Sequence, residues 1–123
     1  MVLTSGTDLI EKQMVDEIAK GQNVLNLGGI LSIKQLGALI EQADGLVCVD
    51  SFPFHLACAL KKPVVALFGP TSDVTWGPWR NPYAKIITVK KSCRPCYLDG
   101  CGGSKRSECL EEISLRQIVD AVG

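Results

Sequence analysis

Four short turns along the chain are built from small, acidic or hydroxyl-bearing residues, the types that let a ligand approach the backbone. They lie at residues 5–7 (Ser-Gly-Thr), 28–29 (Gly-Gly), 50–51 (Asp-Ser) and 69–71 (Gly-Pro-Thr). Where a helix follows such a turn, its free N–H groups and its dipole stabilise a bound anion. Each turn alone is typical of ordinary turn chemistry, but the four together predict a ligand that carries phosphate.

Several other kinds of site are excluded by the sequence. It contains neither a Gly-x-x-x-x-Gly-Lys-Ser/Thr loop nor a Gly-x-Gly-x-x-Gly motif, which argues against a P-loop nucleotidase and a standard dinucleotide fold. His55 is the only histidine, so a metal site with several histidines is excluded, as is a Ser-His pair with a spare base.

Four of the six cysteines follow one another closely, with the spacing C-x2-C-x4-C-x7-C, inside a polar, Gly-rich segment at 92–109. They are Cys93, Cys96, Cys101 and Cys109. In a reducing compartment such clustering favours a structural metal, so we expect a zinc ion held by four thiolates. Free thiols or a single disulfide remain alternatives. The other two cysteines stand in apolar runs and are expected to be buried without a role.

Basic residues are concentrated from residue 80 onward, where eight of the chain's 13 lysines and arginines lie. They are Arg80, Lys85, Lys90, Lys91, Arg94, Lys105, Arg106 and Arg116. Beside the cysteines they suggest a zinc ribbon that binds nucleic acid. Acidic residues interleave with them, however, and no aromatic stacking surface is visible. We therefore expect a solvated basic face and no nucleic-acid partner.

The elements that must position these residues follow from the hydrophobic pattern. Five short runs rich in Val, Ile and Leu predict strands at 2–4, 24–27, 46–49, 64–68 and 86–89, buried on both faces. Helical spacing predicts helices at 8–20, 32–43 and 53–60 and a last one from Ser114, with Asp8, Ser32 and Ser114 as N-caps. Asp8 and Glu11 resemble a capping box. The alternation predicts a Rossmann-like α/β fold, a parallel sheet with flanking helices. The turns then lie at the carboxyl ends of the strands, where such sheets bind ligands.

Composition limits the remaining possibilities. The chain has 123 residues, which is room for one domain, and its 13 basic and 13 acidic residues give no formal net charge. Its longest apolar runs are far shorter than the roughly 20 residues that a transmembrane helix needs. The first residues carry no basic leader, so we expect a cytoplasmic protein without a signal peptide.

Residues 49–71 resemble the donor-binding signature of glycosyltransferase family 9, the bacterial heptosyltransferases. They read Val-Asp-Ser-Phe-Pro-Phe-His-Leu-Ala-Cys-Ala-Leu-Lys-Lys-Pro-Val-Val-Ala-Leu-Phe-Gly-Pro-Thr. The family carries Asp-Thr/Ser-Gly-Pro-x-His-Leu-Ala-x-Ala, then Lys-Pro, an apolar strand and Gly-Pro-Thr. The chain departs from this pattern at Phe52, where the family usually has Gly. The Ser-Gly turn with Glu11, the Leu-Gly-Gly turn at 27–29, the Trp-Gly-Pro-Trp stretch at 76–79 and the cysteine cluster are also similar to the family.

The resemblance implies a GT-B glycosyltransferase with two Rossmann-like domains that face a cleft. Residues 1–123 would form most of the C-terminal domain, which binds a nucleotide-diphospho-sugar donor, typically ADP-heptose. An N-terminal domain would bind the lipopolysaccharide core acceptor and supply the catalytic base. Because that base and the family's leaving-group lysine match no residue here, we expect no catalytic residue in this chain and no transfer by it alone. Catalysis would need no metal, and membrane association would be at most peripheral, at the inner membrane.

The same resemblance assigns roles to seven residues. Asp50 would contact the donor sugar or orient the diphosphate loop, and Ser51 with the amides after it would bind the diphosphate. Glu11, after the turn at Gly6, would accept hydrogen bonds from the ribose hydroxyls. The nucleotide side would be lined by Gly69 and Thr71, while His55 would either fix the loop or touch the ligand.

Simpler roles remain open for several of these residues. Asp50 could be an ordinary turn residue, and Glu11 could serve only as a helix cap. Trp76 and Trp79 could stack on a base or sugar, but we expect them to pin a long loop to the core. Two other functions also remain open. One is a non-catalytic nucleotide-binding module with a metal-stabilised, Cys-rich tail, and the other is a zinc-dependent interaction domain.

Overall fold

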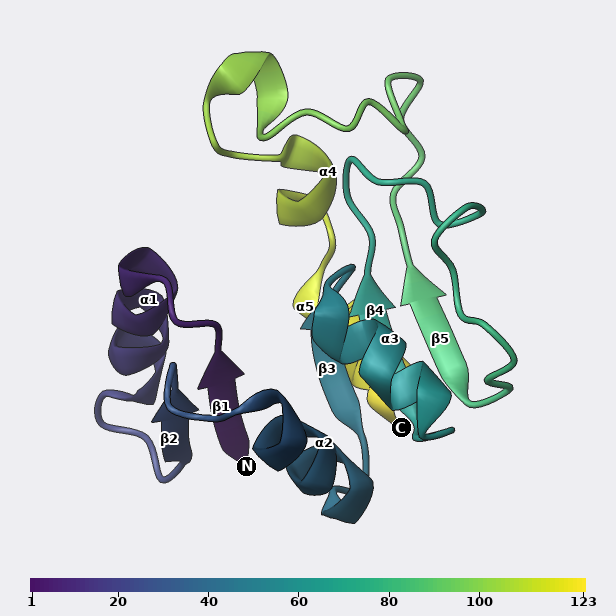
Figure 1. The fold of residues 1–123 in the computed structure, drawn as a ribbon. Coiled ribbons are helices and arrows are strands. Elements are labelled where there is room, and N and C mark those ends of the chain that lie inside the picture. The colour runs from purple at the N-terminus through teal and green to yellow at the C-terminus, as the bar shows by residue number, and fades with distance from the viewer. The chain divides into compact units, whose positions relative to one another are not determined.

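The computed structural model describes residues 1–123, which form two compact units, Met1–Ala38 and Leu39–Gly123 (Figure 1). Every strand pairing within each unit is parallel. The predicted class, a parallel α/β fold with flanking helices, is therefore confirmed. None of the helices is both long enough and apolar enough to cross a bilayer.

The first unit is a β-α-β motif. Strand β1 (Val2–Ser5) pairs with β2 (Leu25–Gly28), and helix α1 (Leu9–Ala19) packs on both strands. The carboxylate of Asp8 caps α1 by accepting hydrogen bonds from the amides of Ile10 and Glu11 at 2.9 and 3.2 Å. Helix α2 (Ile33–Gln42) follows and spans the division between the units.

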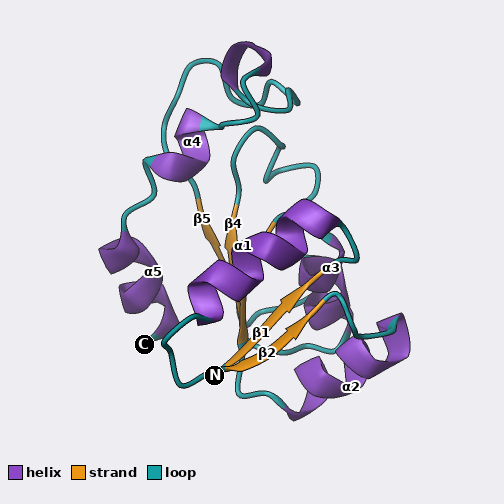
Figure 2. Cartoon of the chain, turned by 90° about the vertical axis from the view of Figure 1, so that its left-hand side faces the viewer, coloured by secondary structure: helices purple, strands orange, loops and turns teal.

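The second unit is a three-stranded sheet covered by a helix on each face. Strands β3 (Leu46–Val49), β4 (Val64–Leu67) and β5 (Ala84–Ile87) lie in that order. Helix α3 (Phe52–Ala59) packs on β3 and β4, while α5 (Leu115–Val122) packs on β4 and β5 from the other side (Figure 2). The chain between β5 and α5 carries a short 3₁₀ turn, η1 (Cys101–Gly103), and helix α4 (Glu108–Glu111). Both lie beyond the carboxyl ends of β4 and β5 (Figure 1).

Apolar packing in the second unit explains why its elements form. Phe54 of α3 and Phe68 after β4 are fully buried, and their rings meet edge to face at 5.5 Å. On the opposite face Val65, Ile87 and Ile113 form a cluster against which α5 packs. Helix α5 begins with the predicted capping box, in which the side chains and amides of Ser114 and Gln117 bond reciprocally.

Two expectations about the strands were wrong. Burial on both faces holds only for β4, whereas β3 alternates between half-buried and exposed residues. The reason is that β4 is the central strand of its sheet and is covered by helices on both faces. The fifth strand also begins at Ala84, two residues before its predicted start, because the apolar run marks only its buried end.

Candidate functional site

The turns that follow β3 and β4 lie at one edge of the second unit's sheet. The two strands are parallel and Val49 pairs with Leu67, so the chain leaves both strands at the same end. Asp50 and Ser51 follow the first strand, and Gly69 and Thr71 follow the second. The structure therefore brings together four of the residues to which the sequence assigned ligand contacts.

The N-terminus of α3 has no side-chain cap. Ser51 holds the N-cap position, but its hydroxyl makes no hydrogen bond to the helix amides and instead lies 3.4 Å from the carbonyl oxygen of Val49. Asp8 and Ser114 do cap their helices. The amide of Ser51 donates to the carbonyl oxygen of Val49 at 2.8 Å, that of Phe54 donates to the carbonyl oxygen of Ser51 at 3.0 Å, and Pro53 has no N–H. The amide of Phe52 is therefore the donor that remains for an anion.

Several side chains around the start of α3 are exposed. Phe52, the residue that departs from the family pattern, is half exposed at the start of the helix. His55 is exposed, and its ring meets Trp76 at 6.4 Å. Trp76 and Trp79 do not pin their loop to the core, because they are 53% and 70% exposed. Their loop is held by backbone and polar contacts instead.

Gly69 has a packing reason to be glycine. It is buried, and a Cβ built on it would lie 2.5 Å from Cγ of Leu110, on α4. The Cys-rich segment therefore packs directly against the turn after β4. This contact explains a glycine at position 69 without any ligand, so a ligand contact there needs separate support.

The Cys-rich segment also donates every hydrogen bond that the carbonyls of this turn accept. Arg94 donates from Nε to the carbonyl oxygen of Gly69 at 2.7 Å and from Nη2 to that of Thr71 at 3.4 Å. The amides of Cys96 and Tyr97 both donate to the carbonyl oxygen of Pro70 at 3.0 Å. All three carbonyls of the Gly-Pro-Thr turn are thus bound by residues 94–97.

Charge pairing fixes Arg94 in this position. Its Nη2 lies 3.3 Å from a carboxylate oxygen of Asp73, and its side chain is only 12% exposed. The expected solvated basic face is wrong for this residue. The prediction of a solvated basic face is also incomplete for Lys91, Lys105 and Arg106, because each of them pairs with a carboxylate.

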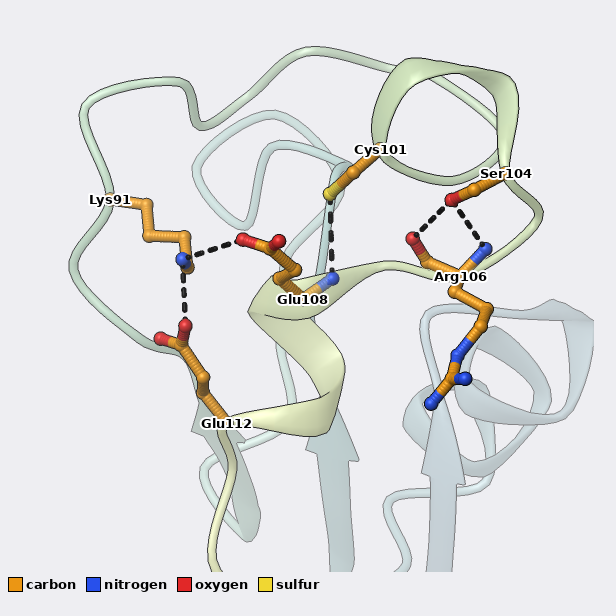
Figure 3. Close-up of polar contacts among 6 residues, drawn as sticks. All are labelled: Lys91, Cys101, Ser104, Arg106, Glu108 and Glu112. Atoms are coloured by element: carbon orange, nitrogen blue, oxygen red, sulfur yellow. Dashed lines mark hydrogen bonds and ion pairs between the residues drawn. The ribbon is translucent and has the colours of Figure 1, made fainter.

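Figure 3 shows how these pairs brace the segment. Lys91 lies between Glu108 and Glu112, with Nζ–O distances of 3.3 and 2.7 Å, and hydrogen bonds to both carboxylates raise its pKa. The sulfur of Cys101 accepts a hydrogen bond from the amide of Glu108 at 3.5 Å. The hydroxyl of Ser104 bonds to the backbone of Arg106. The Cys-rich segment at 92–109 is therefore held by hydrogen bonds and ion pairs of its own residues and their neighbours.

The four clustered cysteines line one small cavity of about 30 Å³ together with Pro70. Their side chains are all free thiols, and Cys109 is buried, which raises its pKa. No three His, Cys, Asp or Glu side chains are grouped as a metal ion would require. Zinc binding by these thiols stays a prediction, which less than one metal equivalent per chain in protein purified without added metal would contradict.

Glu11 and Gly6 form a separate constellation in the first unit. The carboxylate of Glu11 accepts a hydrogen bond from the amide of Gly6 at 2.9 Å, and a Cβ on Gly6 would lie 3.0 Å from that oxygen. Glu11 thus reaches past Asp8 to the turn after β1, which corrects the expected capping box at Asp8. The two residues are brought together as predicted, with the carboxylate exposed.

The sequence reasoning missed three residues of this site: Arg94, Asp73 and Leu110. Arg94 lies between the first two clustered cysteines, but its partners are 21 to 25 residues earlier in the chain. A pattern confined to neighbouring residues carries no signal for such contacts. Leu110 could have been noticed as an apolar residue beside the buried Cys109, although nothing in the sequence links it to Gly69.

A parallel sheet with turns that can bind a ligand at the carboxyl ends of its strands defines a Rossmann-like α/β protein. Residues 1–105 match the sequence model of glycosyltransferase family 9 (heptosyltransferase), and the chain belongs to this family. The family resemblance of the turns and of the 49–71 segment is thereby confirmed.

Curated relatives support the same family. The chain is 43% identical over 84 residues to lipopolysaccharide heptosyltransferase 3 of Escherichia coli. This match covers 66% of this chain and 25% of the relative. It is 32% identical over 124 residues to lipooligosaccharide heptosyltransferase 2 of Campylobacter jejuni. This second match covers 97% of this chain and 39% of the relative. The chain therefore spans only about a quarter to two fifths of the length of these relatives.

Two solved structures share the fold. The E. coli ADP-heptose lps heptosyltransferase II superposes with a TM-score of 0.77 at 24% identity, over 98% of this chain and 34% of that one. A family 9 glycosyl transferase from Veillonella parvula superposes with a TM-score of 0.75 at 22% identity, over the same shares of the two chains.

Proposed function

We propose that these 123 residues form the donor-binding part of a heptosyltransferase-like glycosyltransferase, and that the donor is a nucleoside-diphospho-sugar, with ADP-heptose as the first choice. The observation that carries the proposal is the uncapped N-terminus of α3 at Ser51, which lies at the same sheet edge as the turn at 69–71. The family membership makes a nucleotide-activated sugar the fitting anion for this edge.

The diphosphate would bind to amides rather than to lysines. The amide of Phe52 and the positive end of the α3 dipole would stabilise a phosphate without added basic side chains. Asp50, directly before the N-cap, would accept hydrogen bonds from sugar hydroxyls. Glu11 keeps an exposed carboxylate, suited to the ribose hydroxyls, while one of its oxygens holds the amide of Gly6.

The chemistry would be an inverting transfer. An acceptor hydroxyl of the lipopolysaccharide core attacks the anomeric carbon of the donor, and the bond from that carbon to the diphosphate oxygen breaks. The proton goes to a base that none of these 123 residues matches, and the electron pair leaves with the nucleoside diphosphate. The amide of Phe52, preorganised at the N-terminus of α3, would stabilise the charge that develops on the leaving group. The donor's nature makes the cytoplasm the compartment of the reaction, as part of this proposal.

Thermal-shift measurements with ADP, UDP and GDP and with their sugar derivatives test the proposal. We expect ADP and an ADP-sugar to raise the melting temperature, since a ligand that binds the native state stabilises it by mass action. Asp50→Ala with Ser51→Ala should remove most of this shift. Asp44→Ala is the matched control, because Asp44 is exposed just before the other end of β3. An equal shift in the double variant, or none in the unaltered chain, would overturn the proposal.

A further inference from the structure

The carbonyls of the turn after β4 all point toward the Cys-rich segment, and this fixes where the following amides point. In a trans peptide the N–H of one residue lies antiparallel to the C=O of the residue before it. The carbonyl of Pro70 is bound by Cys96 and Tyr97, so the amide of Thr71 points away from the segment. The carbonyl of Thr71 is bound by Arg94, so the amide of Ser72 points away as well.

Neither of these two amides is used within the protein. The amides of Thr71 and Ser72 donate no hydrogen bond to any other group, although the side chain and carbonyl of Ser72 hold the next turn by bonding the amides of Thr75 and Trp76. Two free donors on adjacent peptide groups, whose preceding carbonyls are bound by residues 94–97, are available to an anionic oxygen. They lie at the same sheet edge as the uncapped N-terminus of α3.

We infer that Arg94 is a positioning residue for ligand binding: it orients the 69–71 turn so that the amides of Thr71 and Ser72 face the anionic part of the donor. The inference rests on the proposed function for the identity of the ligand. Arg94 itself touches no ligand in this account and acts through the backbone.

Arginine fits this task better than lysine. Its planar guanidinium donates from Nε to the carbonyl of Gly69 and from Nη2 to that of Thr71, two groups that a single ammonium cannot reach in the same geometry. Asp73 neutralises and orients the guanidinium at 3.3 Å. The side chain is largely buried, so loss of the guanidinium would leave the carbonyls of Gly69 and Thr71 without these donors.

The test compares Arg94→Lys and Arg94→Ala with a matched control, Arg106→Ala. Arg106 lies in the same segment and pairs with Glu111 at 2.8 Å, but its side chain is 75% exposed and makes no hydrogen bond to the turn. Two quantities are measured in the full 123-residue chain: the heteronuclear NOE of the Thr71 and Ser72 amides, and the dissociation constant for ADP by calorimetry.

We expect both Arg94 variants to lower the NOE of the two amides while the amides of β4 stay unchanged. ADP affinity should fall about tenfold, on the scale of one or two charge-assisted hydrogen bonds, without rescue by lysine. If Arg94 only stabilised the fold, its replacement would lower the melting temperature and leave the ADP affinity of the folded protein unchanged. If Arg94→Ala fails to fold, Asp73→Asn replaces it and should weaken binding by about threefold.

Different results would contradict the positioning role of Arg94 and the proposed function. If the unaltered chain binds ADP and Arg94→Lys binds it equally well, or if the turn amides are as ordered as before, the positioning role is wrong. If the unaltered chain binds no nucleotide, the proposed function is wrong, and the ligand-binding role of Arg94 falls with it.

Discussion

Arg94 donates a hydrogen bond from Nε to the carbonyl oxygen of Gly69 at 2.7 Å, across 25 residues of sequence. This bond joins the Cys-rich segment to the turn at the carboxyl end of β4. It makes the segment a support for the candidate site, whatever the state of its thiols.

Gly69→Ala should lower the free energy of unfolding by about 1–3 kcal/mol, because the added methyl group would overlap the side chain of Leu110. Urea denaturation of the single variant measures the cost. Leu110→Ala in the same chain should recover part of it, so the two substitutions should be non-additive. Strict additivity would show that the turn and α4 do not pack as described.

Glu11→Ala should weaken ADP binding, because it removes the acceptor for the Gly6 amide and the carboxylate proposed for the ribose hydroxyls. The matched control is Glu17→Ala, since Glu17 is an exposed acid on the same helix. Calorimetry with ADP and with 2′-deoxy-ADP separates the two roles. If Glu11 binds the ribose, the variant should discriminate less between the two nucleotides, and unchanged discrimination would leave Glu11 as a turn residue only.

The six thiols should differ in their reaction with iodoacetamide at pH 8. Burial raises the pKa of Cys48 to about 12 and also raises the pKa values of Cys58 and Cys109, so their thiolate fractions are small. The other three cysteines are exposed. Peptide mass spectrometry after a short reaction should find label on the exposed three first, and early labelling of Cys109 would show that its cavity opens.

Cys48 should also make the protein less stable in alkali. Its pKa is raised in the folded state, so its contribution is fully present below the unfolded value near 9 and is lost as the pH rises toward 12. A Cys48→Ala variant should therefore lose less stability than the unaltered chain between these pH values, by on the order of 2–4 kcal/mol. Parallel pH dependences in the two proteins would contradict the raised pKa of the half-buried Cys48 thiol.

Much of the fold could be predicted from the sequence because its signals are local. Five apolar runs indicated the five strands, and Asp8 and Ser114 marked the helix starts that they cap. The shared edge of Asp50 and Thr71 followed from parallel pairing alone. The support from Arg94 could not be predicted, because a buried guanidinium between two cysteines has the same sequence signature as a solvated one. The exposure of Trp76 and Trp79 was missed for a similar reason, since a tryptophan's type does not say whether a loop folds inward.

The most direct test of the donor-binding claim is an amide proton–nitrogen NMR titration of the chain with an ADP-sugar. The account predicts that the largest shift changes fall on Ser51 and Phe52 at the start of α3 and on Thr71 and Ser72 after β4. Little change should occur at the opposite ends of these strands, around Gly45 and Pro63. Changes confined to those opposite ends, or no change at saturating nucleotide, would contradict the account.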